Sequence, residues 1–200
     1  MSENASGRAT VLVVDDEEKV ADVQALTLQR TYETRVAYGG QEALEAFDES
    51  VDAVVLDRRM PDINGDEVLA RIRERDAASG GANPDTVVVM MTAVDPDLNI
   101  LEMEFDDYLT KPVDAETLHS SLERQLDTRQ EEDPRLTEFF SIVSKLDVLE
   151  SELPSSGLAD SEEYARLERR AETLGEELDA TYDDFDEIVG TFREISRGSS

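Results

Sequence analysis

The sequence predicts an α/β domain built on a five-stranded parallel, doubly wound sheet, followed by an α-helical hairpin or coiled coil. Two observations predict this order. Over residues 10–127, short Val-rich runs alternate with helical patterns, as expected for strands buried on both faces of a parallel sheet. Beyond residue 128 the apolar residues keep only helical spacing.

Five strands and five helices are expected in the first domain. The strands are expected at 10–14, 34–38, 52–56, 86–91 and 107–110, and the helices at 17–31, 40–48, 66–78, 96–104 and 114–128. Turn signals, Gly39-Gly40 and Asn64-Gly65, stand before the second and third helices. Strands alternating with helices in this way favour the flavodoxin-like arrangement, in which ligands bind outside the carboxyl ends of the strands.

The C-terminal part is expected to hold two helices. Asp133-Pro134 predicts a helix start, residues 154–162 a turn, and Asp160 with Glu163 a capping box for the second helix. Apolar residues along that second helix recur by three and four, which fits either a hairpin that packs on itself or a dimerising coiled coil. This expected helix seam comprises Tyr164, Leu167, Leu174, Leu178, Phe185, Ile188, Phe192 and Ile195. The expected divisions are a flexible N-terminus at 1–8, the α/β domain at 9–128, the helical domain at 129–197 and a tail at 198–200.

Charge is the unusual property of the composition. The 200 residues hold 49 acidic and 19 basic side chains, for a formal net charge of −30. Such self-repulsion strains a compact state unless salt screens it, which favours a cytoplasmic protein of a salt-accumulating halophile. The chain has no cysteine and no apolar run long enough for a membrane span, so disulfides and membrane insertion are not expected.

Polar residues follow four of the predicted strands at their carboxyl ends. Asp15-Asp16 follow the first strand, Asp57 the third, Thr92 the fourth and Lys111 the fifth. Converging carboxylates are costly unless they are protonated or neutralised by a cation, and a set of oxygen ligands without His or Cys selects a hard ion such as Mg²⁺. A Mg²⁺ site facing a lysine and a hydroxyl suits a phosphoryl group, with a carboxylate as the attacking nucleophile.

These residues carry a family resemblance. The stretches "VLVVDDEEK", "VVLDRRMPDINGDEVL", "VVVMMTA" and "DDYLTKPV" resemble the receiver domain of two-component response regulators over roughly residues 9–128. The resemblance implies a phosphoprotein that accepts a phosphoryl group on Asp57 from a sensor histidine kinase, and it implies no other enzyme activity.

The same resemblance implies the roles of the remaining site residues. Mg²⁺ would be held by Asp15, Asp16, Asp57 and the backbone carbonyl of Arg59. Thr92 and Lys111 would contact the phosphoryl group, Thr92 and Tyr108 would form the switch pair, and Lys111-Pro112 would be a cis peptide. Arg58 and the Arg59 side chain are expected in a solvated loop.

One departure concerns the fourth helix. Thr92 and Lys111 are 19 residues apart, about three fewer than in most receivers, so the helix near 96–104 is expected to be short or remodelled. The family's output surface, built from the fourth helix, the fifth strand and the fifth helix, is therefore in question.

The stretch "MTAVDPDLNILEMEFDDYLTKPV" followed by an acidic hairpin resembles response regulators of halophilic archaea that end in a HalX domain. Three outputs stay open: contact with another copy or a partner helix through the hairpin, regulation of transcription through DNA or the transcription machinery, and an enzyme activity. Direct DNA binding is disfavoured by the acidity of residues 129–200 and by the lack of a helix-turn-helix pattern. The hairpin holds no catalytic constellation, which disfavours the enzyme.

Overall fold

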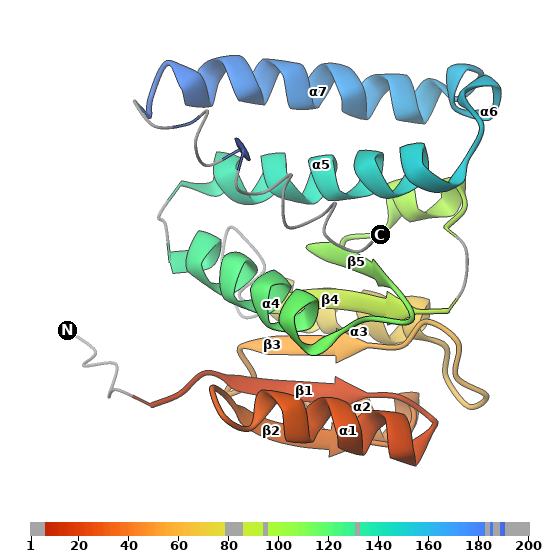
Figure 1. The fold of residues 1–200 in the computed structure, drawn as a ribbon, viewed down its shortest axis with the longest axis vertical. Helices are drawn as coiled ribbons and strands as arrows, with labels where there is room; N and C mark the ends of the chain where they lie inside the picture. The colour runs from red at the N-terminus through yellow and green to blue at the C-terminus, as the bar shows by residue number, and fades with distance from the viewer. Residues whose placement is uncertain are drawn as a thin grey trace. The chain divides into compact units, whose positions relative to one another are not determined.

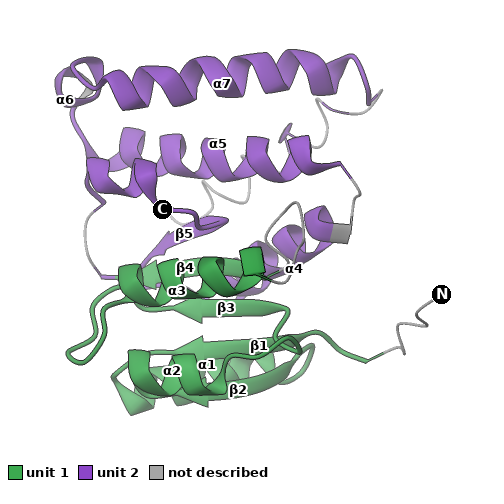
Figure 2. Cartoon of the chain, turned by 180° about the vertical axis from the view of Figure 1, so that it is seen from behind, with its two compact units in different colours: residues 1–92 green, residues 93–200 purple. Residues whose placement is uncertain are grey.

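The computed structural model describes residues 7–78, 86–93, 96–130, 133–182, 185 and 189–190. The chain forms two compact units, residues 1–92 and 93–200 (Figure 2). Its five strands belong to one sheet in the order β2-β1-β3-β4-β5. This order is the doubly wound, flavodoxin-like arrangement that the alternation of apolar runs and helical patterns predicts.

In the described residues of the first unit, four strands and three helices alternate along the chain (Figure 1). They are β1 (Thr10–Val14), α1 (Glu18–Leu28), β2 (Glu33–Ala37), α2 (Gly40–Ala46), β3 (Ala53–Leu56), α3 (Gly65–Ala78) and β4 (Val87–Thr92). Strand β1 pairs in parallel with β2 and β3, and β3 with β4. Helix α1 covers one face of these strands, and α2 and α3 cover the other (Figures 1 and 2).

Strands β3 and β4 are buried along their whole length, and β1 from Val11 to Val14. Both faces of these strands carry Val, Leu and Met. Their sequences are therefore continuous apolar runs and do not alternate between apolar and polar residues. Because this core is tightly packed, it fixes the ends of the strands. The polar residues that directly follow the strands are positioned by it.

The second unit holds one strand and, among the described residues up to Asp179, five helical segments. They are η1 (Leu98–Glu102), β5 (Asp107–Thr110), α4 (Ala115–Gln130), α5 (Pro134–Glu152), α6 (Ser155–Ala159) and α7 (Glu162–Asp179). Within this unit α5 lies between β5 and α7 (Figure 1).

The shortened fourth helix is confirmed. In place of an α-helix at 96–104, the chain forms the five-residue 3₁₀-helix η1, whose N-cap Asp97 accepts a hydrogen bond from the Asn99 N–H at 3.0 Å. The predicted start of the first C-terminal helix is also confirmed, because Asp133 caps α5 and Pro134 is its first residue.

Three details of the C-terminal prediction are wrong. The segment 154–162 is not only a turn, since it contains the short helix α6. The cap of α7 is Ser161, whose hydroxyl accepts the Tyr164 N–H at 3.1 Å, and not a box of Asp160 with Glu163. The expected long helix is interrupted, because α7 ends at Asp179.

The predicted seam packs inside the hairpin. Tyr164, Leu174 and Leu178 are buried on α7, which packs along α5, and the Phe185 ring lies 5.3 Å from the Phe139 ring of α5. Leu167 is half-buried. Ile188, Phe192 and Ile195 lie outside the described residues. Of the two interpretations of the seam, the described residues form the hairpin that packs on itself.

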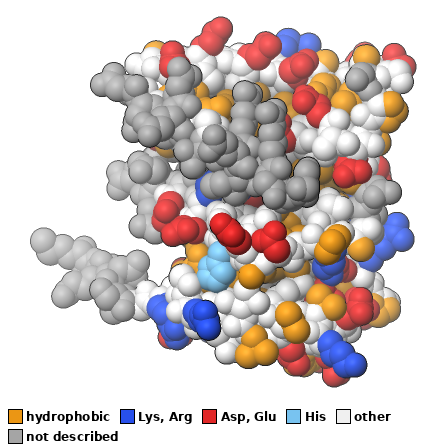
Figure 3. Space-filling view, in the orientation of Figure 1, with side chains coloured by type: hydrophobic (Ala, Val, Ile, Leu, Met, Phe, Trp, Pro, Cys, Tyr) orange, Lys and Arg blue, Asp and Glu red, His pale blue; other side chains and the backbone are white. Residues whose placement is uncertain are grey.

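Acidic side chains are spread over the visible surface rather than gathered in one patch (Figure 3). Arg and Lys side chains lie between them, which matches a net charge of −30 distributed along the whole sequence. In the described part of the chain, no helix is both long enough and apolar enough to cross a membrane.

Candidate functional site

Asp15 and Asp57 lie next to each other at the carboxyl edge of the sheet. Val14 of β1 is paired with Leu56 of β3, and the two aspartates are the residues that follow this pair. The Asp57 N–H donates to the Val14 carbonyl at 2.9 Å, which extends the ladder by one step. Asp15 is 1% and Asp57 7% exposed, so two carboxylates are buried on neighbouring strand ends.

Backbone N–H groups orient both carboxylates. The Glu17 N–H donates to Asp15 Oδ1 at 2.9 Å, and the Arg59 N–H donates to Asp57 Oδ2 at 2.8 Å. In each case the donor is two residues beyond the aspartate, so a local turn of the backbone orients the side chain. Each hydrogen bond engages one of the two carboxylate oxygens.

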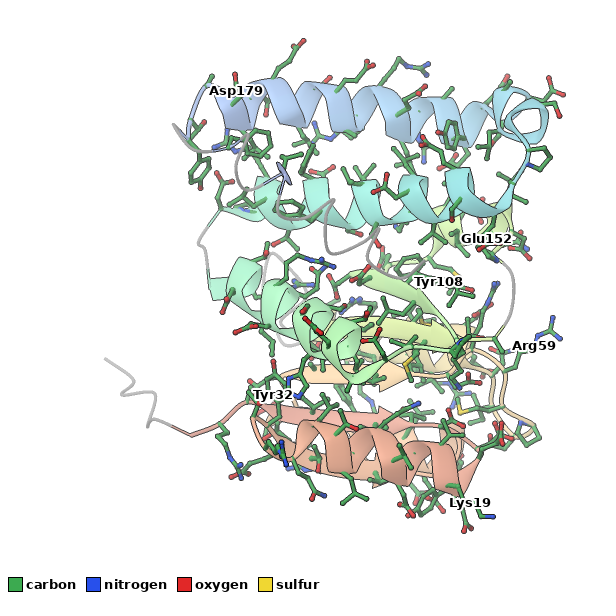
Figure 4. The ribbon with its side chains drawn as sticks, in the orientation of Figure 1. Lys19, Tyr32, Arg59, Tyr108, Glu152 and Asp179 are labelled. Atoms are coloured by element: carbon green, nitrogen blue, oxygen red, sulfur yellow. The ribbon has the colours of Figure 1, made fainter. Side chains whose placement is uncertain are left out.

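The donor set at this edge fits a hard cation. Asp15 and Asp57 supply buried carboxylates, while Asp16 is exposed on the same turn and the Arg59 side chain projects outward from the loop after β3 (Figure 4). Among the described residues, no three His, Cys, Asp or Glu side chains lie together as a metal cage. A metal here would therefore need backbone carbonyl or water oxygens besides carboxylates, which is the usual coordination of Mg²⁺.

Thr92 is the last residue of β4, the strand next to β3. Leu56 is paired with Met90, so Thr92 lies at the same edge of the first unit as Asp57. Its side chain is fully buried. The first unit thus brings together three of the predicted residues, Asp15, Asp57 and Thr92.

Lys111 and Tyr108 belong to the second unit. Lys111 directly follows β5, and its peptide bond to Pro112 is cis, as predicted. Tyr108 lies on β5 (Figure 4), is 3% exposed, and its ring centroid is 5.5 Å from that of Phe105.

The expectation that Arg58 lies in a solvated loop is wrong. Arg58 is 9% exposed, and its guanidinium donates to both carboxylate oxygens of Asp66, from Nε at 2.9 Å and from Nη2 at 3.2 Å. Asp66 is in the first turn of α3. This bidentate pair joins the residue after Asp57 to the helix that follows the loop, whereas the Arg59 side chain is exposed as predicted.

A second anchor of the same loop is Asp62, which the sequence analysis did not single out. Its carboxylate accepts the N–H groups of Gln41 at 2.9 Å and Gly40 at 3.1 Å, at the start of α2. The backbone hydrogen bond from Gln41 is the main cause that holds the pKa of Asp62 below its usual range. Gly39 has a φ of 153°, which favours glycine and brings the chain close to this carboxylate.

Comparison with known families identifies the first part of the chain. Residues 11–123 match the response regulator receiver domain. The chain belongs to the response regulator receiver family. Residues 128–195 match the HalX domain, so a HalX domain follows the receiver domain, as the hairpin and its preceding motif predict.

Individual relatives agree with this assignment. The chain is 39% identical over 179 residues to a protein of Haloferax volcanii named as a transcriptional regulator, covering 89% of this chain and 29% of that protein. It is 32% identical over 134 residues to the sensory transduction protein RegX3 of Mycobacterium tuberculosis, covering 64% of this chain and 56% of RegX3. The chain therefore spans well under two thirds of either relative.

Among solved structures, the fold is similar to the BeF₃-activated receiver domain of DrrB from Thermotoga maritima. The TM-score is 0.53 at 29% identity, over 60% of this chain and 98% of that domain. The receiver family supplies response regulators of two-component systems, a class of signalling proteins, and this chain is one of them.

Proposed function

We propose that Asp57 is the residue that accepts the phosphoryl group in this response regulator, with a sensor histidine kinase or a small acyl phosphate as donor. The observation that carries the proposal is the placement of Asp57. It is a buried carboxylate at the end of β3, oriented by the Arg59 N–H, beside the buried Asp15 and on the strand next to Thr92.

The proposed reaction is an attack by a carboxylate oxygen of Asp57 on phosphorus. The bond from phosphorus to the donor atom breaks, its electron pair stays with the donor, and an acyl phosphate forms on Asp57. Because this transfer depends on positioning and charge neutralisation, the fixed orientation of the Asp57 carboxylate favours it.

Mg²⁺ fits the oxygen donors at this edge. Asp15, Asp57 and the Arg59 carbonyl would hold it directly, with the exposed Asp16 contributing through a water, and when bound it would neutralise charge on the phosphoryl oxygens. Two buried carboxylates on neighbouring strand ends repel each other, which supports a cation as part of the working site.

Three further residues are proposed to respond to the phosphoryl group. The Thr92 hydroxyl donates a hydrogen bond to a phosphoryl oxygen, and the Lys111 ammonium neutralises charge on the same group. Tyr108, buried on β5, completes the switch with Thr92. These roles rest on the family to which the chain belongs and on the strand ends that carry Thr92 and Lys111.

The proposed output is contact with other proteins through the HalX helices rather than catalysis on a separate substrate. Because Leu174 and Leu178 are fully buried in the hairpin, a second copy or a partner helix that used this seam would have to displace α5. A role in transcription is the second candidate, since the Haloferax relative carries that name.

Chemical mapping tests the phosphoacceptor. After incubation with Mg²⁺ and acetyl phosphate, borohydride reduction converts an aspartyl phosphate into homoserine. We expect peptide mass spectrometry to find homoserine at position 57. Homoserine at another aspartate, with residue 57 unchanged, would contradict the proposal.

A further inference from the structure

Helix α5, the first helix of the HalX domain, is buried on nearly all sides. Its buried residues are Leu136, Phe139, Phe140, Ile142, Val143, Ser144, Lys145, Leu146 and Leu149. Helix α7 packs along one side of α5, and β5, η1 and α4 contact the rest (Figure 1). A helix that is buried all round is a core element of its unit rather than a separate appendage.

Three side chains of α5 attach this helix to β5 and the residues just before it. The Ser144 hydroxyl donates to Asp107 Oδ1 at 2.6 Å, and the Ser141 hydroxyl donates to the Phe105 carbonyl at 2.8 Å. The Lys145 ammonium lies 5.2 Å from the centroid of the Phe105 ring, within range of a cation–π interaction.

Asp107, the first residue of β5, is the centre of this attachment. It is 4% exposed, and its carboxylate accepts hydrogen bonds from side chains of two helices of the second unit. Besides Ser144 of α5, the Ser121 hydroxyl of α4 donates to Oδ2 at 2.6 Å, and the Arg124 guanidinium of α4 donates to the same oxygen. One carboxylate therefore fixes β5 against α4 and α5 together.

The hydrogen bonds of Asp107 also affect the residues that follow it along the chain. Tyr108 is the next residue and donates its N–H to Asp107 Oδ1, and Lys111 comes directly after β5. Any loosening of the Asp107 carboxylate changes the freedom of the strand that carries both residues. Tight placement of a group that contacts the reacting atoms is worth large rate factors.

We infer that Asp107 and Ser144 are positioning residues for phosphoryl transfer, through which the HalX helix α5 holds β5 and thereby Lys111 in place. This inference rests on the proposed function of Asp57 and Lys111, and it makes the HalX domain a participant in the receiver's chemistry.

The test uses the full chain with Ser144→Ala, and Ser151→Ala as matched control. Ser151 is an exposed serine of the same helix, and its hydroxyl donates to the Val148 carbonyl of the same helix. Phosphorylation by acetyl phosphate is followed by intact-mass spectrometry over a range of Mg²⁺ concentrations. Backbone hydrogen exchange of β5 is measured on the unphosphorylated proteins.

We expect Ser144→Ala to lower the maximal rate constant of phosphorylation by about tenfold, because a looser β5 positions Lys111 less tightly for the reaction. The Mg²⁺ concentration at half-maximal rate should stay unchanged, and β5 should exchange faster. Ser151→Ala should behave like the wild type in all three measurements. A variant that is only partly unfolded would lose amplitude, the fraction of chains phosphorylated, without a change in rate constant.

Three outcomes would overturn the inference. Equal rate constants in Ser144→Ala and Ser151→Ala would show that the hydroxyl positions nothing that the reaction uses. Faster hydrogen exchange of β5 without a slower reaction would show that the Ser144 contact stabilises the fold but does not contribute to phosphoryl transfer. A wild type that takes up no phosphoryl group would remove the reaction to be coupled, while the exchange data would still report whether Ser144 holds β5.

Discussion

Gly65 lies directly against the backbone of Asp57. A Cβ atom placed on Gly65 would come within 2.3 Å of the Asp57 carbonyl oxygen, and the Gly65 N–H donates to the Arg58 carbonyl at 2.8 Å. Helix α3 can start this close to the proposed phosphoacceptor only because residue 65 has no side chain.

Replacing Gly65 should therefore disturb the site itself. Gly65→Ala forces backbone against backbone, so we expect a loss of about 1–3 kcal/mol of unfolding free energy and slower phosphorylation. Urea denaturation and a timed phosphorylation assay measure the two effects. Gly157→Ala is the control, because no atom lies within 4 Å of its added Cβ, and its behaviour should match the wild type. Equal behaviour of both variants would contradict the close approach.

The adjacent arginines Arg58 and Arg59 should differ in their effect on stability. Arg58→Ala removes a buried side chain and leaves Asp66 without its bidentate partner, so we expect a loss of about 1–2 kcal/mol. Arg59→Ala removes an exposed side chain and should change the unfolding free energy by less than about 0.5 kcal/mol. Urea denaturation in molar salt compares them, and a larger loss from Arg59→Ala would count against the buried pair.

Asp133 predicts a pH dependence of stability. The hydrogen bond from Arg135, with smaller contributions from the Arg135 N–H and the Tyr182 hydroxyl, lowers the pKa of Asp133 to about 2. An aspartate in the unfolded chain has a pKa of about 3.9, so the folded chain binds the Asp133 proton less tightly than the unfolded chain does. The stabilisation is thus complete above about pH 4 and is lost as the pH falls towards about 2.

Asp133→Asn tests this dependence because asparagine also caps helices but does not titrate. Between neutral pH and about pH 3, the urea midpoint of the variant should fall less than that of the wild type. The control Asp160→Asn, at an exposed acid after α6, should keep the wild-type slope. Identical slopes in all three proteins would argue against a depressed pKa at Asp133.

The seam of α7 should behave as a core and not as a subunit interface. Leu174 is fully buried, so Leu174→Ala should cost about 2–5 kcal/mol of unfolding free energy, and half-buried Leu167→Ala less. Because the contacts lie within one chain, the unfolding midpoint should not depend on protein concentration. A midpoint that rises with concentration would instead indicate a dimeric coiled coil.

The strands and their polar ends were predictable from the sequence because they depend on local patterns. The short runs TVLVV and DYLT predict β1 and β5 at their observed bounds, and the 19-residue spacing from Thr92 to Lys111 predicts the loss of a full fourth helix. The cis bond at Lys111-Pro112 follows from the family resemblance.

The sequence did not predict the contacts between elements that are distant along the chain. Arg58 follows an apolar run and resembles a loop residue until its partner Asp66 is seen on α3. The sequence also does not reveal that α5 is buried on nearly all sides, because Ser144 and Lys145 resemble the polar face of a surface helix. Only the packing of β5 and α4 against that face explains these two residues.

The central claim, that Asp57 accepts the phosphoryl group, is tested most directly by intact-mass spectrometry in molar salt. Wild type, Asp57→Asn and the control Asp160→Asn are incubated with Mg²⁺ and acetyl phosphate, with and without a chelator. We expect one added phosphoryl group on wild type and Asp160→Asn, none on Asp57→Asn, and none when Mg²⁺ is removed. A phosphoryl group that still appears on Asp57→Asn, or a wild type that gains no mass under these conditions, would contradict it.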